Sequence, residues 1–278
     1  MKNSEFIKSP LQYTGGKYKI LKDIFPLFPD EIHTFIDLFG GGFNVGINAD
    51  ADNIIYNDTL SPIVELLQYM YNNTTKSLLK EIDGYIKEYE LTKENVDGYL
   101  KLRTHYNEAT KKRPMELYTL ICYGFNNQIR FNSKGEFNIP FGKREFNPIL
   151  REKFCVFTRE LHTKKIAFTN KTFSELKIEK LNATSFVYAD PPYLGSVASY
   201  NEQGGWTENN EKELLSLLDT LTEQGIPWAL SNNLKYENPL LEDFIKKYKI
   251  HYLGSHHTNC SYQKKDKNAD IEILVTNY

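Results

Sequence analysis

A run of three glycines directly after a short apolar segment constrains the fold more than any other feature of the sequence. Residues 34–39 form the apolar run, and the glycines occupy positions 40–42. A second apolar run at 53–56 stops just before Asp58, and the apolar spacing of residues 62–70 predicts a helix. A doubly wound α/β sheet begins with this order of elements: a strand, a glycine turn, a second strand, an acidic residue and a helix.

Further apolar runs predict the other strands of this sheet. They cover residues 165–168, 185–189, 227–231 and 271–276. Residues 211–224 carry five leucines on one helical face and are followed by Gly225, which is placed to end a helix. For the earlier helix, Ser61 is the expected N-cap, with Pro62 at the first helical position. We therefore expect a Rossmann-like, mostly parallel sheet with helices against it.

The middle of the chain has a different pattern. Between about 74 and 120 the sequence is polar, with Tyr and Leu at helical spacing. Residues 124–142 are rich in Asn, Gly and Phe, a composition that suggests a hairpin or an ordered loop. We expect one domain made of residues 1–70 and 155–278, interrupted by a mainly helical insert with a hairpin at 71–154.

The composition excludes several classes of protein. Hydrophobic residues make up 40% of the chain and charged residues 25%, as in a soluble globular protein. No apolar window is long enough for a transmembrane helix, and the N-terminus lacks a secretory signal. Cys122, Cys155 and Cys260 are too few and too far apart for a disulfide framework. We expect a cytoplasmic protein with no membrane partner.

Charge is distributed unevenly along the chain. The net charge is −2, yet residues 101–165 contain 14 Lys and Arg against 6 Asp and Glu. A basic segment in an otherwise acidic protein suggests a local contact with a polyanion, or else a solvated basic face. Charge alone leaves both interpretations open.

The most informative tetrapeptide is Asp190-Pro191-Pro192-Tyr193, which follows the predicted strand 185–189 directly. Ligands of doubly wound sheets bind beyond the carboxyl ends of strands, where this loop lies. Two prolines fix φ and remove two backbone donors, which leaves a stiff loop that presents carbonyl oxygens. A carboxylate, a rigid carbonyl and an aromatic ring together suit a planar ligand that bears an amine. A structural Pro-Pro turn is the alternative.

The glycines at 40–42 permit close approach of a ligand to the backbone. They lack the spacing of a dinucleotide-binding loop and of a P-loop, so no phosphate chain is implied. Asp58, at the end of the second predicted strand, is placed to accept hydrogen bonds from ribose hydroxyls. A nucleoside without phosphates fits this combination, and S-adenosylmethionine is such a compound.

Four segments together resemble the Dam-type DNA adenine-N6 methyltransferases, especially their T-even phage members. The segments are Tyr13–Lys17, Phe35–Gly42, Arg130–Gly142 and Asp190–Tyr193. Weaker similarity lies at Leu230–Asn232 and Glu272–Tyr278. The similarity covers nearly the whole chain in the family's order, and it implies an S-adenosylmethionine-dependent methyltransferase fold with an inserted target-recognition domain.

The resemblance implies roles for individual residues of the sheet domain. Asp190, Pro191 and Tyr193 match the catalytic motif, in which the carboxylate and the Pro191 carbonyl accept the two N6 hydrogens of adenine and Tyr193 stacks on the base. The matching cofactor contacts are Tyr13, Lys17, Asp37, Phe39, Gly40, Gly41, Gly42, Asp58, Thr172, Phe173 and Asp190. For Phe173, ordinary core packing remains the alternative.

The resemblance also implies residues that bind DNA. Arg130 matches the arginine that reads the guanine of GATC, Phe125 matches an aromatic that enters the duplex, and Pro140 is placed to touch a thymine methyl. Further expected contacts are Asn126, Gln128, Asn132, Lys134, Lys143 and Arg144. For Phe125 the alternative is core packing, and for the polar residues it is loop solvation. Gln12 and Gln128 depart from the family pattern, which leaves the exact target sequence open.

The expected function is methyl transfer from S-adenosylmethionine to an adenine rotated out of duplex DNA, within GATC. The expected state is a monomer in solution, with room for more than one copy on DNA, in a bacterial or phage-infected cell. Methylation of another DNA site, of RNA or of a protein amide is the alternative within the same enzyme class. A catalytically inert DNA-binding relative is the alternative outside it.

Metal-dependent and covalent catalysis receive no support from the sequence. The stretch His256-His257-Thr258-Asn259-Cys260 has no second pair of ligands at suitable spacing, so we expect no metal. There is no GxSxG motif, and Cys122 has no adjacent base.

Overall fold

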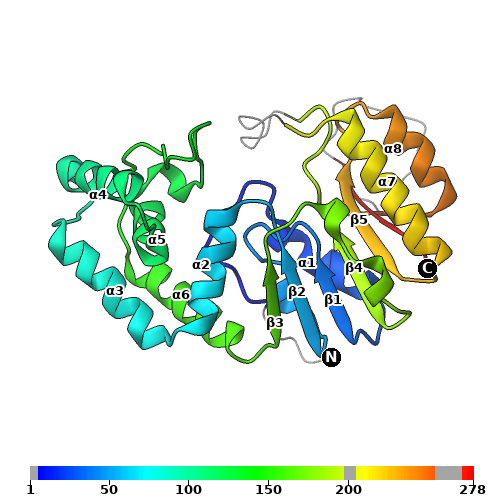
Figure 1. The fold of residues 1–278 in the computed structure, drawn as a ribbon, viewed down its shortest axis with the longest axis horizontal. Coiled ribbons are helices and arrows are strands. Elements are labelled where there is room, and N and C mark those ends of the chain that lie inside the picture. Colours follow the sequence, from blue (N-terminus) through cyan, green and yellow to red (C-terminus); the bar gives the residue numbers. More distant parts are fainter. Residues whose placement is uncertain (1–5, 197–204, 254–270) are drawn as a thin grey trace. The chain divides into compact units, whose positions relative to one another are not determined.

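The structure is a computed structural model that describes residues 6–196, 205–253 and 271–278. The chain divides into two compact units. The sheet unit comprises residues 17–59 and 165–278, and the helical unit comprises residues 1–16 and 60–164. Figure 1 shows the strands in the first unit and a group of helices in the second.

The sheet unit contains seven hydrogen-bonded strands within its described residues, in the order β3-β2-β1-β4-β5-β7-β6. The strands are β1 (Thr34–Asp37), β2 (Asn53–Asn57), β3 (Ile166–Thr169), β4 (Ser185–Ala189), β5 (Trp228–Asn233), β6 (Lys249–Tyr252) and β7 (Glu272–Thr276). β1 to β5 run parallel, whereas β7 pairs antiparallel with both β5 and β6. The expectation of a mostly parallel α/β sheet is confirmed.

The strand order reverses between β1 and β4. From β1 the chain proceeds outward to β2 and β3, and the later strands β4 and β5 lie on the other side. Such a reversal opens a crevice at the carboxyl ends of the two central strands, where α/β proteins bind ligands. The glycine turn follows β1 and the Asp190 loop follows β4, so the sheet brings both predicted motifs to this crevice.

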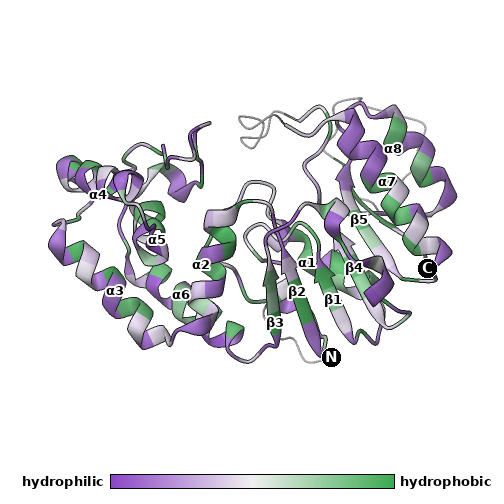
Figure 2. Cartoon of the chain, viewed as in Figure 1, coloured by the Kyte–Doolittle hydropathy of each residue, from purple (hydrophilic) through white to green (hydrophobic). Residues whose placement is uncertain are grey.

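Apolar side chains cover both faces of the central strands, as a buried parallel sheet requires. On one face Val187, Leu230 and their neighbours pack with the leucines of α7 (Glu208–Glu223) and with α8 (Pro239–Phe244). On the other face Phe28, which follows the short α1 (Leu21–Ile24), packs against Phe186 at 4.8 Å between ring centroids. Figure 2 shows hydrophobic residues along the strands and alternating colours along α7.

The glycine turn after β1 packs closely on β2. A Cβ atom on Gly40 would lie 2.2 Å from Cε2 of Tyr56, a fully buried side chain of β2. The Tyr56 hydroxyl donates a hydrogen bond of 2.8 Å to the Gly41 carbonyl, and Gly41 has a positive φ of 47°. The turn therefore requires glycine at position 40 for space and favours it at position 41 for backbone conformation.

The helical unit is built around one buried helix. Its helices are α2 (Ser61–Asn72), α3 (Thr75–Glu88), α4 (Val96–Glu108), α5 (Pro114–Tyr123) and α6 (Pro148–Leu161). Residues 115–123 of α5 are all buried, and this helix packs against α2, α3 and α4. A helix that is buried on every side is typical of the centre of a helical group.

The segment 124–142, which we name the recognition hairpin, folds back on itself after α5. Antiparallel bridges join Gly124 to Phe141 and Phe131 to Phe137. Its backbone is fastened to α4, because the Ile139 carbonyl accepts hydrogen bonds from the Tyr99 hydroxyl at 2.8 Å and from Arg103 at 3.0 Å. The expectation of a hairpin or an ordered loop agrees with this geometry.

Two local expectations are wrong. Leu60, without a side-chain capping bond, is the N-cap of α2, so the helix starts at Ser61, one residue earlier than expected. β6 is absent from the expected strands, because Lys249 and His251 interrupt any apolar run there. The predicted division at 71–154 remains a prediction, although α2 and residues 1–16 belong to the same compact unit as the insert.

None of the helices in the described residues is both long and apolar enough to cross a membrane.

Alanine substitutions at two glycines test the packing of the turn. Gly40→Ala forces a Cβ into the Tyr56 ring, so we expect it to lower the free energy of unfolding by about 1–3 kcal/mol. Gly84 lies exposed within α3, where an added Cβ meets nothing within 4 Å. Gly84→Ala should therefore raise stability by about 0.5–1 kcal/mol, through helix propensity. Urea unfolding followed by circular dichroism measures both, and an unchanged midpoint for Gly40→Ala would contradict the described turn.

Candidate active site

Three carboxylates lie at the carboxyl ends of neighbouring parallel strands. Asp37 is the last residue of β1, Asp58 follows β2, and Asp190 follows β4. The register pairs Asp37 with Tyr56 of β2 and with Tyr188 of β4, so each of the other two carboxylates is two residues beyond a partner of Asp37. The sheet therefore concentrates negative charge at the strand-order reversal.

Asp37 is the most deeply buried of the three, with 2% of its surface exposed. Its Oδ2 accepts a hydrogen bond of 3.0 Å from the Gly46 amide. Burial, together with the negative charges of Asp190 and Asp58, raises the pKa of Asp37 to about 7, against the lowering effect of the Gly46 hydrogen bond. Near neutral pH this carboxyl group is divided between its two protonation states.

Asp58 is bonded to the glycine turn. Its Oδ2 accepts a hydrogen bond of 2.8 Å from the Gly41 amide. The preceding residue, Asn57, donates through its side chain to the Leu38 carbonyl at 3.0 Å. These bonds hold the turn after β1 against the end of β2, which fixes the backbone of Phe39, Gly40 and Gly42 beside the carboxylates.

Asp190 forms an ion pair with Lys17. The distance from Lys17 Nζ to Asp190 Oδ1 is 2.9 Å, and the lysine side chain is 5% exposed and that of Asp190 18%. Burial raises the pKa of Asp190 above its usual value, whereas the charge and hydrogen bond of Lys17 act to lower it. The sequence pattern places Lys17 and Asp190 in separate motifs, and the structure brings their side chains into contact.

The aromatic ring of Tyr193 lies beside this ion pair. Its centroid is 5.1 Å from Lys17 Nζ, within range of a cation–π contact. The Tyr193 hydroxyl is 3.1 Å from Glu272 Oε2 and 3.4 Å from Asp190 Oδ1. Burial and these two carboxylates raise the pKa of Tyr193 well above its usual value, so the hydroxyl stays protonated. Pro191 is buried next to Asp190.

A group of three aromatic rings lies next to the glycine turn. The Phe39 centroid is 5.7 Å from those of Phe173 and Trp206, and the latter two are 5.5 Å apart. Phe173 also belongs to the core cluster of the sheet unit. The indole of Trp206 donates to the carboxylate of Glu211, a residue that is 1% exposed on α7. Phe39 and Trp206 are half-buried, so the group combines core packing with accessible ring surface.

Two further predicted cofactor contacts, Thr172 and Tyr13, take part in local structure. Thr172 is exposed and forms a capping box with Glu175 at the start of a short 3-10 helix, a local structural role. Tyr13 belongs to the helical unit, where it is half-buried and its carbonyl accepts from the Gly16 amide at 3.2 Å. The cofactor-binding roles of both residues remain predictions.

The predicted DNA-binding residues lie on the recognition hairpin and just beyond it. Phe125 is 49% exposed, so the interpretation of this ring as core is wrong. Arg130 donates from Nε to Asn138 Oδ1 at 2.8 Å and from Nη2 to the Asn138 carbonyl at 3.2 Å. Its guanidinium group is thus held across the hairpin, and base reading by Arg130 remains a prediction.

The other predicted DNA contacts are mostly exposed. The exposed residues are Asn126, Gln128, Lys134, Pro140, Lys143 and Arg144, and Asn132 is half-buried. Asn126 accepts a hydrogen bond of 3.1 Å from Arg144, and Asn132 Oδ1 accepts from the Lys134 and Glu136 amides. These bonds shape the loop, and they neither support nor contradict contact with phosphates.

Two residues near the site were not expected from the sequence. Trp206 precedes α7 without any motif, and Glu272 lies in a segment whose weak family similarity suggested no role. A clue to Trp206 was present, because it is one of only two tryptophans in the chain. For Glu272, the tertiary structure alone reveals the nearness to Tyr193, because β7 pairs with β5 and the Glu272 carboxylate accepts from the Tyr193 hydroxyl.

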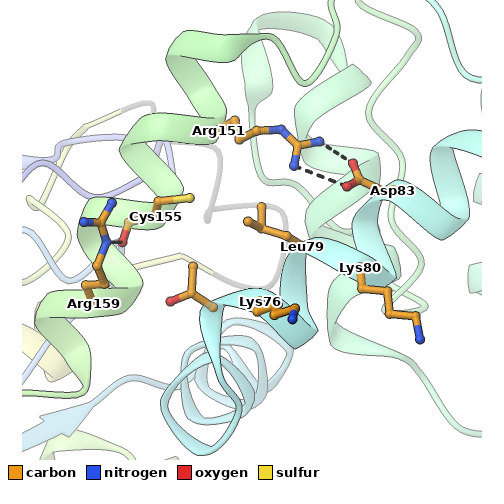
Figure 3. Close-up of a pocket in the computed structure, with 8 residues that line it drawn as sticks. Lys76, Leu79, Lys80, Asp83, Arg151, Cys155 and Arg159 are labelled. Atoms are coloured by element: carbon orange, nitrogen blue, oxygen red, sulfur yellow. Dashed lines mark hydrogen bonds and ion pairs between the residues drawn. The ribbon is translucent and has the colours of Figure 1, made fainter.

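The described residues contain no group of three or more His, Cys, Asp or Glu suited to a metal ion, and His256–Cys260 lie outside the described residues. An open groove of about 570 Å³ lies between α3 and α6 of the helical unit. Figure 3 shows Arg151 paired with Asp83 across this groove, and no predicted site residue lines it.

Comparison with known proteins gives the family. Residues 13–259 match the model of the D12 class N6 adenine-specific DNA methyltransferases. The chain is 43% identical to the type II methyltransferase M.FokI of Planomicrobium okeanokoites and 39% identical to the modification methylase StsI of Streptococcus sanguinis. These alignments cover 100% and 99% of this chain but only 44% and 43% of the two relatives.

A shorter relative supports the resemblance to Dam. The DNA adenine methylase of Escherichia coli K12 is 25% identical, and the alignment covers 90% of this chain and 87% of that protein. The order of glycine turn, recognition hairpin and Asp190 loop therefore occurs within a family match that spans most of the chain. The chain belongs to the D12 class N6 adenine-specific DNA methyltransferase family, whose methyl donor is S-adenosylmethionine.

Proposed function

We propose that this chain transfers a methyl group from S-adenosylmethionine to the N6 amine of an adenine that is rotated out of duplex DNA. The observation that carries the proposal is the buried Lys17–Asp190 pair beside the Tyr193 ring, at the strand-order reversal. The proposal goes beyond the family match, because the chain spans less than half the length of M.FokI and StsI.

Asp190 and Pro191 would activate the amine. The lone pair of the N6 nitrogen is delocalised into the purine ring, so the nitrogen is a weak nucleophile. Hydrogen bonds from its two hydrogens to the Asp190 carboxylate and the Pro191 carbonyl favour a tetrahedral nitrogen with a localised lone pair. Once the nitrogen has gained a fourth bond, it must lose a proton. Asp190 is suited to accept that proton because burial raises its pKa.

The residues around the glycine turn fit the cofactor. S-adenosylmethionine, when bound, supplies a methyl group attached to a positively charged sulfur. Asp37 and Asp58 provide negative charge that favours binding of a cation, with Lys17 neutralising part of it through Asp190. The ring surfaces of Phe39 and Trp206 provide an apolar site for an adenine. The cofactor contacts proposed for single residues rest on this fit.

The recognition hairpin supports DNA as the substrate. It exposes the Phe125 ring, and Lys143 and Arg144 extend from the chain just after it. Rotating a base out of a duplex costs a few kcal/mol, and an aromatic side chain such as Phe125 would fill the vacated space. The monomeric state, binding of more than one copy and a cytoplasmic location remain predictions, as does the contact of Arg130 with a guanine of GATC.

Labelled S-adenosylmethionine and matched duplexes test the reaction and its site. We expect the wild type to label a duplex with one GATC, and to leave a duplex lacking GATC unlabelled. Asp190→Ala should lower the transfer rate by about 10²–10³-fold, because it removes one of two groups that polarise the amine. Liquid chromatography of the digested DNA identifies N6-methyladenine as the product.

The matched control for Asp190→Ala is Asp243→Ala on α8. Asp243 is exposed and pairs only locally with Lys246, so its loss should leave the rate unchanged. Equal labelling of both duplexes would refute GATC as the target site but would still support methyl transfer to DNA. An Asp190→Ala variant with the wild-type rate would refute the proposed mechanism. DNA binding by a wild type that never binds S-adenosylmethionine would support the inert relative instead.

The raised pKa of Asp37 predicts pH-dependent binding of the cofactor. Because the pKa of Asp37 is about 7, raising the pH from 6 to 8 deprotonates this carboxyl group and adds a negative charge. Affinity for S-adenosylmethionine should rise over this interval, by up to about tenfold for a single ionisation. S-adenosylhomocysteine lacks the sulfonium charge, so its affinity should rise less. Calorimetric titration measures both, and an undiminished pH dependence in Asp37→Asn would contradict the assignment.

The two tryptophans provide a second measurement of cofactor binding. Trp228 is fully buried in the core of the sheet unit, whereas Trp206 is half-buried beside Phe39. We expect S-adenosylmethionine to change the intrinsic fluorescence, and Trp206→Ala to abolish the change and weaken binding about fivefold, the effect of one aromatic contact. Persistence of the full fluorescence change in Trp206→Ala would exclude Trp206 from the cofactor site.

A further inference from the structure

Glu272 contacts the site from a strand to which the sequence assigned no site residue. It is the first residue of β7, and the register of the sheet pairs it with Asn233 of β5. Its Oε1 accepts a hydrogen bond of 3.1 Å from the Asn233 side chain, and its Oε2 accepts one of 3.1 Å from the Tyr193 hydroxyl. Each carboxylate oxygen therefore has a partner, and the two bonds fix the orientation of the group.

The Tyr193 hydroxyl lies between two carboxylates but has a single hydrogen to donate. Its oxygen is 3.1 Å from Glu272 and 3.4 Å from Asp190, so the shorter contact marks Glu272 as the acceptor. Asp190 Oδ1 is already occupied by Lys17 at 2.9 Å. Without Glu272, the hydroxyl hydrogen would turn to Asp190 and occupy the group that the target amine needs.

A carboxylate at position 272 is not explained by folding alone. The main-chain pairing of β7 with β5 and β6 does not need a charged side chain. The negative charge of Glu272 also raises the pKa of Asp190 and that of Tyr193, which shows that like charges are held close together. Two carboxylates held this close disfavour each other's ionised form. We therefore look for the role of Glu272 in the reaction and not in stability.

We propose that Glu272 is a positioning residue for methyl transfer. Its carboxylate accepts a hydrogen bond from the Tyr193 hydroxyl, and this bond holds the Tyr193 ring in the orientation that stacks on the target base. Asp190 then remains available to accept a hydrogen bond from the target amine. This inference rests on the proposed function. It assigns no direct contact between Glu272 and the substrate.

A double-mutant cycle tests the coupling. We expect Glu272→Ala and Tyr193→Phe each to lower kcat about tenfold, the effect of one lost hydrogen bond, with the Kd for S-adenosylmethionine unchanged. Because both variants break the same contact, the double variant should be no slower than either single variant. Glu272→Gln keeps an acceptor for Tyr193, so its kcat should recover to within about threefold of the wild type.

The control variant is Glu213→Gln, which changes one exposed glutamate on α7. Its kcat should equal that of the wild type. Multiplied losses in the double variant, or a wild-type kcat for Glu272→Ala, would overturn the role of Glu272. Failure of the wild type to methylate any DNA would instead refute the proposed function, so the two failures are distinguishable.

The contact itself has a readout that does not depend on activity. Incorporation of 3-fluorotyrosine gives fluorine resonances for the tyrosines, and their comparison with Tyr193→Phe identifies the resonance of Tyr193. We expect Glu272→Gln to shift this resonance and Glu213→Gln to leave it in place. An unshifted Tyr193 resonance in Glu272→Gln would overturn the inference.

Discussion

The crowding of carboxylates at the end of the sheet is the constraint on which the rest of the site depends. Asp37, Asp58 and Asp190 are brought together by the parallel pairing of β1 with β2 and β4. Burial, and to a smaller extent the negative charges of Asp190 and Asp58, raises the pKa of Asp37 to about 7. Lys17 and the amides of the glycine turn offset part of this unfavourable charge. The remaining negative potential favours a cationic ligand, which is why the arrangement suits a sulfonium compound better than a nucleotide with phosphates.

The backbone at and after the glycine turn stabilises the crowded carboxylates, whether or not a ligand is bound. The Gly41 and Gly46 amides reach the carboxylates of Asp58 and Asp37, and Gly40 leaves the space that the Tyr56 ring fills. A larger residue at Gly40 would move the turn away from β2, and the hydrogen bond to Asp58 would lengthen. The same backbone path thus supports the fold and holds two acidic groups in place.

The sequence predicts the parts of the fold that depend on local patterns. The apolar run before Asp190 is a fully buried strand, and Gly225, with φ of 68°, follows α7. The sequence did not predict β6, because this strand lies at the edge of the sheet and its alternating polar residues form no apolar run. The contacts of Trp206 and Glu272 depend on packing between distant segments. No spacing rule in a single sequence carries information about such contacts, whereas the Asp190 loop is recognisable from four adjacent residues.

The proposed reaction and its proposed target sequence differ in how far the free protein determines them. Asp190, Lys17 and Tyr193 are held by mutual contacts of buried or half-buried groups, so their geometry is set before any substrate binds. Arg130 donates to Asn138 within its own hairpin from Nε and Nη2, which uses two of the five N–H donors of its guanidinium group. Base reading by this residue is a proposal, and it depends on the DNA as much as on the protein. The residues proposed for the chemistry can therefore be inferred from the free protein, whereas the choice of bases depends on contacts that form between two partners.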